Sequence, residues 1–171
     1  GTEANEAAIK LARLSAGKGR YKIITFQGSF HGRTMGSLSA TAQPKYHEGL
    51  GPLVAGFLYA PFGDLEAAAK LIDDETCAIL IEPIQGEAGI VLPPAGFLRA
   101  ARELADERNV LLILDEIQSG LGRTGEWFAY MHEGIRPDGV IVGKALGGGL
   151  LPVSAFVAIN AVMDLLEPGS H

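Results

Sequence analysis

VLLILDE, residues 110–116, is an unbroken apolar run that ends in two carboxylates. A short run without a polar face is typical of a strand that is covered on both sides, as in a parallel sheet. CAILIE (77–82) and GVIVGK (139–144) repeat the pattern, and each again ends in a charged residue. The three runs therefore predict buried strands in one sheet.

The segments around these runs alternate between helical and extended patterns. Helices are predicted for four stretches, the third with Asp64 as N-cap and the fourth with a proline at its start: 2–16, 31–42, 64–72 and 94–109. YKIITF (21–26) and SAFVAI (154–159) predict two further strands, the second followed by a short helix to about Leu166, and the Pro/Gly-rich stretch 43–56 predicts a loop. This alternation predicts an α/β domain with a mainly parallel sheet between two helical layers.

Composition narrows the class of protein. With 171 residues, 47% of them hydrophobic and 20% charged, the chain can build one globular core and does not have a disordered composition. The net charge of −6 argues against nucleic-acid binding, and no apolar run approaches the roughly 20 residues that span a bilayer. The single cysteine, Cys77, lies in an apolar run and no signal-peptide pattern opens the chain, so a reducing, cytoplasmic setting fits.

Glu82, Asp115 and Lys144 each follow a predicted buried strand. One such charge can simply emerge into solvent, but ligands of open α/β sheets bind beyond the carboxyl ends of the strands. Three charges at one edge therefore indicate a functional site.

Nucleotide hydrolysis is one interpretation, because LLILDE (111–116) resembles a Walker B strand. It requires a G-x-x-x-x-G-K-[ST] loop. The nearest candidate, GVIVGK, is one residue short, is followed by Ala145 and is itself the apolar strand, so we set this interpretation aside.

Pyridoxal phosphate (PLP) chemistry is the second interpretation. It needs a lysine that forms an imine, a carboxylate beside the pyridine nitrogen, a helix start for the phosphate, and apolar groups on the ring faces. Lys144 and Asp115 end separate strands, and Gly1-Thr2 opens a helix. Phe30 and Ile117 are candidates for the two ring faces.

Five motifs in this order make the chain resemble the large domain of the class III (subgroup II) aminotransferases, of the acetylornithine and ornithine type: GTEANEAAIKLAR (1–13), FHGRTMGSLSAT (30–41), EPIQGEAG (82–89), LDEIQSGLGRTG (114–125) and GKALGGGLLPVSA (143–155). The resemblance implies a PLP-dependent transferase of fold type I that works as a homodimer. It also implies that residues 1–171 are an incomplete PLP-binding large domain, without an N-terminal segment and a C-terminal small domain. A partner's phosphate-contacting Ser or Thr would come just after His171.

The resemblance also implies roles at the cofactor. Lys144 would form the imine and move the proton, and we expect it to be buried, which would favour its basic form. Asp115 would pair with the pyridine nitrogen, and Gln118 would bind the phenolic oxygen. Further cofactor contacts would come from Gly1, Thr2, Phe30 and Ile117.

On the substrate side, Arg33 resembles the arginine that grips a carboxylate, for which its planar fork is suited. Glu87 resembles a gating acid whose arginine partner lies beyond residue 171, and Glu82 resembles a support for Gln118. Glu116 is expected to be structural, because side chains alternate along an extended segment. We assign no catalytic role to His31, and we predict no metal site.

The implied reaction is a ping-pong transfer of the terminal amine of acetylornithine or ornithine to 2-oxoglutarate, giving a semialdehyde and glutamate. Relatives that act on 4-aminobutyrate, and mutases or decarboxylases on the same fold, remain as alternatives. A further alternative is that residues 1–171 are a non-catalytic fragment of such an enzyme.

Overall fold

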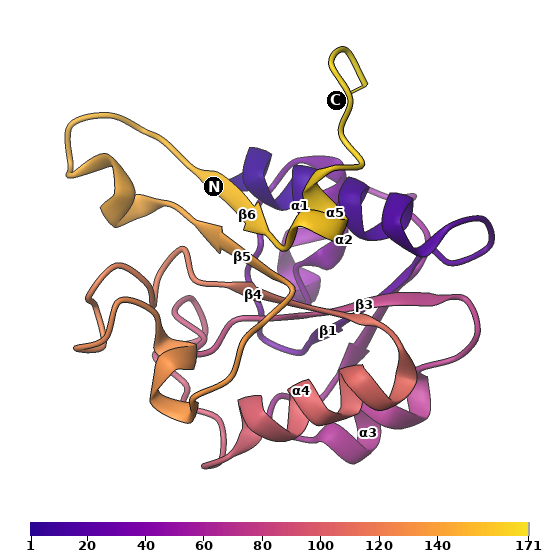
Figure 1. The fold of residues 1–171 in the computed structure, drawn as a ribbon, viewed down its shortest axis with the longest axis horizontal. Helices are drawn as coiled ribbons and strands as arrows, with labels where there is room; N and C mark the ends of the chain where they lie inside the picture. The colour runs from indigo at the N-terminus through magenta and orange to yellow at the C-terminus, as the bar shows by residue number, and fades with distance from the viewer. Residues whose placement is uncertain (171) are drawn as a thin grey trace.

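The computed structural model describes residues 1–170 as one six-stranded sheet between helices (Figure 1). The strand order is β2-β1-β3-β4-β5-β6, and all neighbouring pairs are parallel except β5 and β6. The strands are β1 (Lys22–Phe26), β2 (Phe57–Ala60), β3 (Thr76–Ile81), β4 (Leu111–Asp115), β5 (Gly139–Val142) and β6 (Ala155–Ala158).

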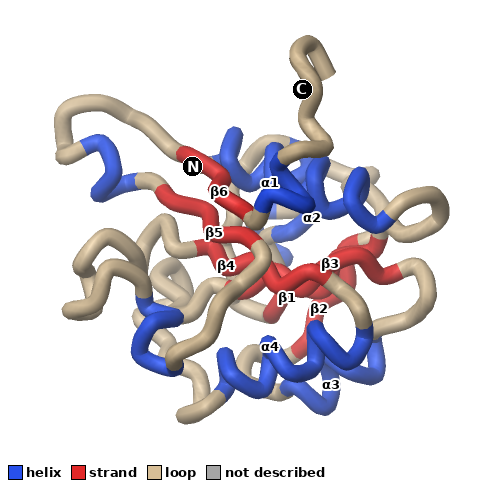
Figure 2. Tube along the Cα trace, in the orientation of Figure 1, coloured by secondary structure: helices blue, strands red, loops and turns tan. Residues whose placement is uncertain are grey.

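Helices cover both faces of this sheet. The α-helices are α1 (Thr2–Ala16), α2 (Met35–Ala40), α3 (Leu65–Leu71), α4 (Phe97–Arg108) and α5 (Asn160–Met163). Three 3₁₀ turns are η1 (Pro44–Tyr46), η2 (Ala129–Glu133) and η3 (Lys144–Gly147). In Figure 2, α3 and α4 lie on one face, and α1, α2 and α5 lie on the other.

Successive residues of a strand point to opposite faces of the sheet and pack into two separate hydrophobic cores. Ile79 and Leu112 pack with the α3 and α4 layer, whereas Leu80 and Ile113 pack with α1. Because both faces are covered, the central strands need apolar residues at every position, which explains their unbroken hydrophobic runs. Ile81 is in register with Leu114, so Glu82 and Asp115 leave neighbouring strands at the same sheet edge.

The predicted α/β architecture is confirmed, with corrections at the ends of elements. The second helix is shorter than predicted because residues 31–34 form a loop, and the fourth begins at Phe97 after Gly96 in a left-handed conformation, which leaves Pro94 outside it. The last helix ends at Met163. Strand β2 was missed, since only Ala60 of its four residues is buried and the apolar signal is weak.

Asp64 is confirmed as an N-cap, because its Oδ1 accepts a hydrogen bond from Ala67 N at 2.8 Å. Within residues 1–170, no helix has both the length and the apolar character needed to traverse a bilayer.

Candidate functional site

A cavity of about 640 Å³ opens at the carboxyl edge of the sheet, where β3, β4 and β5 end. It brings together every site residue predicted from the sequence except Glu87. These lining residues are Gly1, Thr2, Phe30, Arg33, Glu82, Asp115, Ile117, Gln118 and Lys144. Asp115 and Lys144 therefore line one shared cavity.

Asp115 is the most tightly held group in this cavity. Its side chain is 3% exposed. Oδ2 accepts a hydrogen bond from Asn5 Nδ2 at 3.0 Å and lies 2.8 Å from His31 Nδ1, while Oδ1 accepts from Ile117 N at 3.1 Å. These contacts fix the carboxylate at the end of β4, beside the cavity that Asp115 lines.

His31 and Asn5 are neighbours of Asp115 that were not predicted as site residues from the sequence. Both are buried, and the atoms facing away from Asp115, His31 Nε2 and Asn5 Oδ1, have no hydrogen-bond partner among residues 1–170. Asn5 carried a signal in the sequence, because it interrupts the apolar face of α1. His31 carried none, since 84 positions separate it from Asp115.

Lys144 is exposed, which corrects the expectation that it would be buried. Its φ of 43° lies in the left-handed region, an uncommon conformation for a residue with a side chain. Strain of this kind persists only where the surroundings impose it, and it accumulates at functional sites. Here it turns the chain sharply from the end of β5 into η3.

Ile117 forms one apolar wall of the cavity. Its side chain fits there because two neighbouring positions are glycines. A Cβ at Gly1 would stand 2.7 Å from Ile117 Cδ1, and a Cβ at Gly143 would stand 3.3 Å from Ile117 Cγ1. The absence of side chains at both positions makes room for Ile117 between α1 and the end of β5.

Phe30 also lines the cavity, and its ring packs against Tyr46 and Arg33. The two rings meet edge to face at 5.6 Å between centroids, and the Arg33 guanidinium lies 5.6 Å from the Phe30 centroid and 5.3 Å from that of Tyr46. Arg33 is exposed at this position, so its charged group remains available to a ligand at the cavity mouth.

Among the described residues, the hydrogen bonds of the Glu82 carboxylate come from backbone N–H groups and not from Gln118. Its Oε1 accepts from Phe30 N at 2.7 Å, and its Oε2 accepts from Gly86 N at 3.4 Å. The side chain of Gln118 packs on Gly86, where an added Cβ would overlap it. Glu82 and Gln118 thus both contact Gly86.

Glu87 and Gln118 meet at the rim of the cavity. Gln118 Nε2 donates to Glu87 Oε1 at 3.4 Å, and Glu87 is exposed. Arg123 and Thr124 line a second, neighbouring cavity together with Lys144.

Glu116 faces away from this site, as expected for a structural residue. Its carboxylate accepts from Ser119 Oγ at 2.5 Å and from Tyr130 N at 3.1 Å. Burial raises the pKa of Glu116, against the lowering effect of these hydrogen bonds.

Burial raises the pKa of Glu82 to about 7, with nearby Asp115 adding to the rise and His31 opposing it. In the unfolded chain a glutamate titrates near pH ~4.3, so the folded state holds the Glu82 proton over a higher pH range. The contribution of this proton to stability is complete below about pH 4 and is lost as the pH rises toward 7.

Glu82→Gln should therefore remove a pH dependence of unfolding. Between about pH 4.5 and 7, the free energy of unfolding of the native protein should fall relative to the variant by roughly 3 kcal/mol. Urea denaturation across this range measures the difference, with the exposed Glu103 on α4 changed to Gln as the control. Parallel pH profiles of Glu82→Gln and the native protein would contradict this assignment.

Known proteins match this chain over its whole length. The family model described as aminotransferase class-III matches residues 1–171. An acetylornithine aminotransferase of Aquifex aeolicus is 51% identical over the whole chain, and one of Methanopyrus kandleri is 54% identical. An ornithine aminotransferase of Staphylococcus saprophyticus is 51% identical. The chain spans 46%, 43% and 45% of these proteins, respectively, which is less than half of each.

Solved structures show the same fold. The chain matches two structures of the ornithine aminotransferase of Toxoplasma gondii with TM-scores of 0.94 and 0.95 at 39% identity. The match covers all of this chain and 42% of those chains. The second structure is described as having partial occupancy of PLP at its active site.

Proposed function

Because the chain belongs to the class-III aminotransferase family, whose members depend on PLP, we propose that the protein transfers the terminal amino group of acetylornithine or ornithine to 2-oxoglutarate. The observation that carries this proposal is the single cavity lined by both Lys144 and Asp115. Relatives named for these two substrates match the whole chain at 51% identity. Since the relatives are more than twice as long, the proposal concerns the protein to which residues 1–171 contribute the PLP-binding domain.

The residues of the cavity fit PLP. The carboxylate of Asp115 is buried and pinned by three neighbours, which suits it to hold a protonated pyridine nitrogen. Ile117 and Phe30 supply apolar walls, and Gln118 supplies an amide beside them. The exposed Lys144 supplies the amine for covalent attachment.

The phosphate of the cofactor would be held at the start of α1. The N–H groups of the first helical turn have no acceptor within the helix, and the helix dipole favours an anion at this end. Gly1 and Thr2 belong to this turn and line the cavity. A phosphate dianion here would satisfy donors that the helix itself cannot.

Bound PLP supplies an electron sink that makes a proton on the donor carbon removable. The chain's own residues would move this proton and hold the charge of the cofactor ring. Lys144 would remove that proton as general base and deliver it, as general acid, to the carbon of the cofactor that carried the aldehyde, which its flexible side chain permits. Asp115, fixed by Asn5 and His31, would hold a proton on the pyridine nitrogen.

Substrate selection would fall to the cavity mouth. Arg33 offers a planar guanidinium to the substrate carboxylate, and Glu87 offers a negative charge to a second cationic or amino group. The hydrogen bond between Gln118 and Glu87 is long and exposed, so Glu87 can exchange partners at little cost. These features support a site that accepts the amino donor and a dicarboxylic oxo acid in turn.

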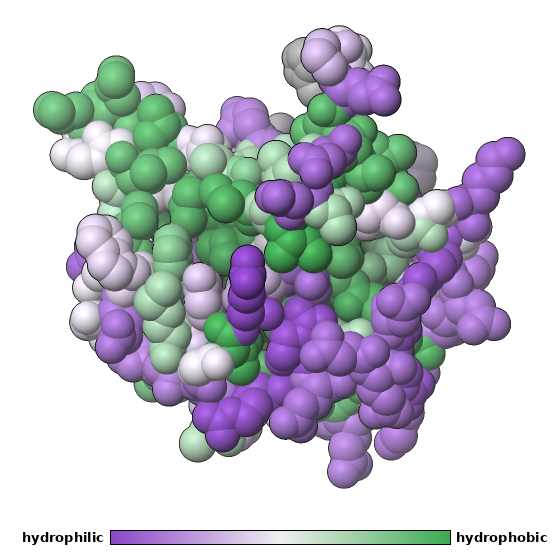
Figure 3. Space-filling model, in the orientation of Figure 1, coloured by the Kyte–Doolittle hydropathy of each residue, from purple (hydrophilic) through white to green (hydrophobic). Residues whose placement is uncertain are grey.

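A homodimer in the cytoplasm is part of the same proposal. Leu150 and Leu151 are 88% and 69% exposed in the segment between β5 and β6, and Figure 3 shows a hydrophobic surface over this segment. Exposed leucines next to a site are typical of an interface. The one cysteine, Cys77, is buried and unpaired, which agrees with a reducing compartment.

A substrate panel tests the proposed activity. With PLP and 2-oxoglutarate present, glutamate should form fastest with acetylornithine or ornithine as donor. Turnover with 4-aminobutyrate exceeding both would favour the 4-aminobutyrate-type alternative. Absence of any visible absorption change on addition of PLP would instead identify residues 1–171 as a non-catalytic piece when tested alone.

A further inference from the structure

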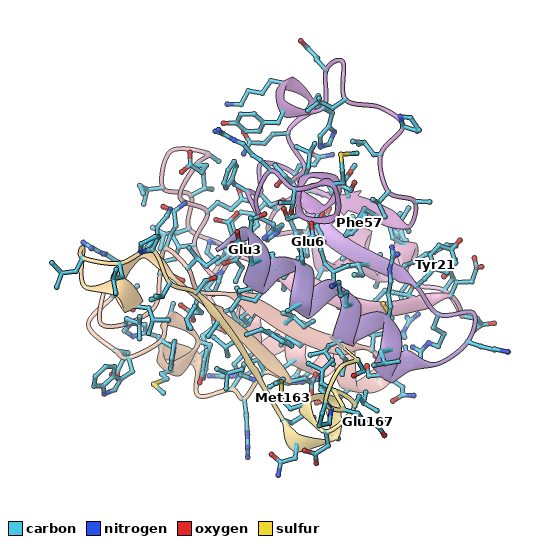
Figure 4. All side chains as sticks on the ribbon, turned by 90° about the horizontal axis from the view of Figure 1, so that it is seen from above. Glu3, Glu6, Tyr21, Phe57, Met163 and Glu167 are labelled. Atoms are coloured by element: carbon cyan, nitrogen blue, oxygen red, sulfur yellow. The ribbon has the colours of Figure 1, made fainter. Side chains whose placement is uncertain are left out.

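Asn5 places a polar side chain on the buried face of α1. Figure 4 shows α1 lying over the sheet, with Glu3 and Glu6 marking its first half. Among the buried residues that the structure describes in this helix, Asn5 is the one with a polar side chain. The others are Ala4, Ala8, Ile9, Leu11 and Ala12. Asparagine is also a weaker helix former than alanine or leucine, so the partners of Asn5 must explain its presence here.

The amide nitrogen of Asn5 joins the start of α1 to the end of β4. Nδ2 donates to Asp115 Oδ2 at 3.0 Å, a buried bond between residues 110 positions apart, and also donates to Gly1 O at 3.5 Å. The reverse orientation of the amide would bring its oxygen against the carboxylate oxygen, so nitrogen is the atom that faces Asp115. Gly1 and Asp115 both line the cavity, at the ends proposed for the phosphate and for the pyridine nitrogen.

The hydrogen bonds of Asp115 leave one acceptor position open. An ionised carboxylate offers about four acceptor positions, two on each oxygen. Asn5 and His31 occupy both positions of Oδ2, and Ile117 N occupies one position of Oδ1. A further donor, such as a protonated pyridine nitrogen, would therefore meet Oδ1.

Asn5 differs from His31 because its donor is permanent. Nδ1 of a histidine donates only in the tautomer or charge state that carries a proton there, whereas an amide N–H donates in every state. Asn5 therefore keeps Oδ2 occupied whatever the state of His31. Turning Oδ2 of Asp115 toward a ligand would leave the amide N–H of Asn5 buried without this acceptor, which is costly.

We propose that Asn5 is a positioning residue that acts through Asp115: its amide occupies Oδ2 and so presents Oδ1 to the pyridine nitrogen of PLP. The inference rests on the proposed function, since it requires PLP in this cavity. Asn5 belongs to the helix whose first turn would bind the phosphate, so the same bond fixes the carboxylate relative to that turn. One molecule of PLP must reach both places at once, which requires that the groups binding it are held rigidly by their own neighbours.

The experiment uses the full-length protein freed of cofactor and two ligands: PLP, and its 1-deaza analogue, in which carbon replaces the pyridine nitrogen. The ratio of their dissociation constants isolates the contact with the ring nitrogen. Asn5→Leu keeps the branched shape of the side chain and removes the donor. It should weaken PLP binding about tenfold, as loss of the partner that orients a ligand group does at metal sites.

Binding of the analogue to Asn5→Leu should change less than about threefold, because the analogue has no ring nitrogen for Oδ1 to accept from. Lys10→Ala changes an exposed position on the same helix and serves as the control, with both dissociation constants expected to stay as in the native protein. Equal losses for PLP and the analogue in Asn5→Leu would show a general structural role and overturn the inference.

A double-mutant cycle tests whether Asn5 acts through Asp115. In an Asp115→Ala background, Asn5→Leu should change PLP affinity less than about twofold, because the oxygen that Asn5 positions is gone. A loss of about tenfold that persists in this background would show an independent role for Asn5 and contradict the inference.

The remaining outcomes are also decisive. If Asn5→Leu does not fold, Asn5→Ala takes its place in the same comparison of ligands. If Asp115→Ala binds too little PLP to measure, the ratio for the two ligands decides. Failure of the native protein to bind PLP at all would overturn the proposed function as well, whereas normal native binding with an unaffected Asn5→Leu overturns only the role of Asn5.

Discussion

Lys144→Ala is expected to abolish transamination and the absorption band of covalently attached PLP. The amine of Lys144 is the group at the cavity that can both bond to the cofactor and carry the proton, and alanine can do neither. The loss should reach the detection limit of a glutamate-formation assay. The cavity itself should remain, so PLP should still bind non-covalently.

Two further variants test whether Lys144 is needed as a nucleophile or only as a positive charge. Lys144→Arg keeps a cation at the strand end but removes the nucleophile, and we expect it to be as inactive as Lys144→Ala. Lys70→Ala removes an exposed lysine from α3, in the opposite helical layer, and should leave turnover unchanged. Activity of Lys144→Ala above background in a preparation free of native protein would contradict the assignment.

Asp115→Ala should lower kcat by roughly 10²- to 10³-fold, the range seen when a preorganised stabilising group is removed from an active site. Loss of the carboxylate leaves the pyridine nitrogen without its counter-ion and also removes the acceptor of Asn5 and His31. Asp115→Asn should lose nearly as much rate, because the amide keeps the shape but not the charge. Steady-state kinetics at saturating PLP measures both effects.

The adjacent Glu116 provides the comparison. Glu116→Ala leaves Ser119 Oγ and Tyr130 N without their acceptor, so it should lower the free energy of unfolding by about 1–3 kcal/mol. Its effect on kcat should be far smaller than that of Asp115→Ala. Equal kinetic losses from the two variants would count against the role of Asp115 as counter-ion.

The sheet and its reactive edge were predictable because they follow from local physics. Strands covered on both faces must be apolar throughout, so β3, β4 and β5 stood out from the surrounding sequence. A charge directly after each run then marked the edge that α/β sheets use for ligands. Glu82, Asp115 and Lys144 reached the same cavity for this reason.

The supporting contacts were not predictable in the same way, since they join residues that are distant in sequence. Nothing local indicates that His31 meets Asp115, or that Glu6 reaches Thr34. The exposure of Lys144 also escaped prediction. A lysine after a buried strand looks buried, but the left-handed turn at this residue carries it out of the sheet.

The position of α1 has a consequence for the order of events during synthesis. This helix is made before β5, β6 and α5, yet it packs against all three. Contacts of such long sequence separation form slowly, because the intervening chain must close first. The start of α1 and the lysine at position 144 can meet only after the ribosome has released most of the domain. A cofactor held by both of these groups would therefore bind after β5 has been made, and it would stabilise the folded domain by mass action.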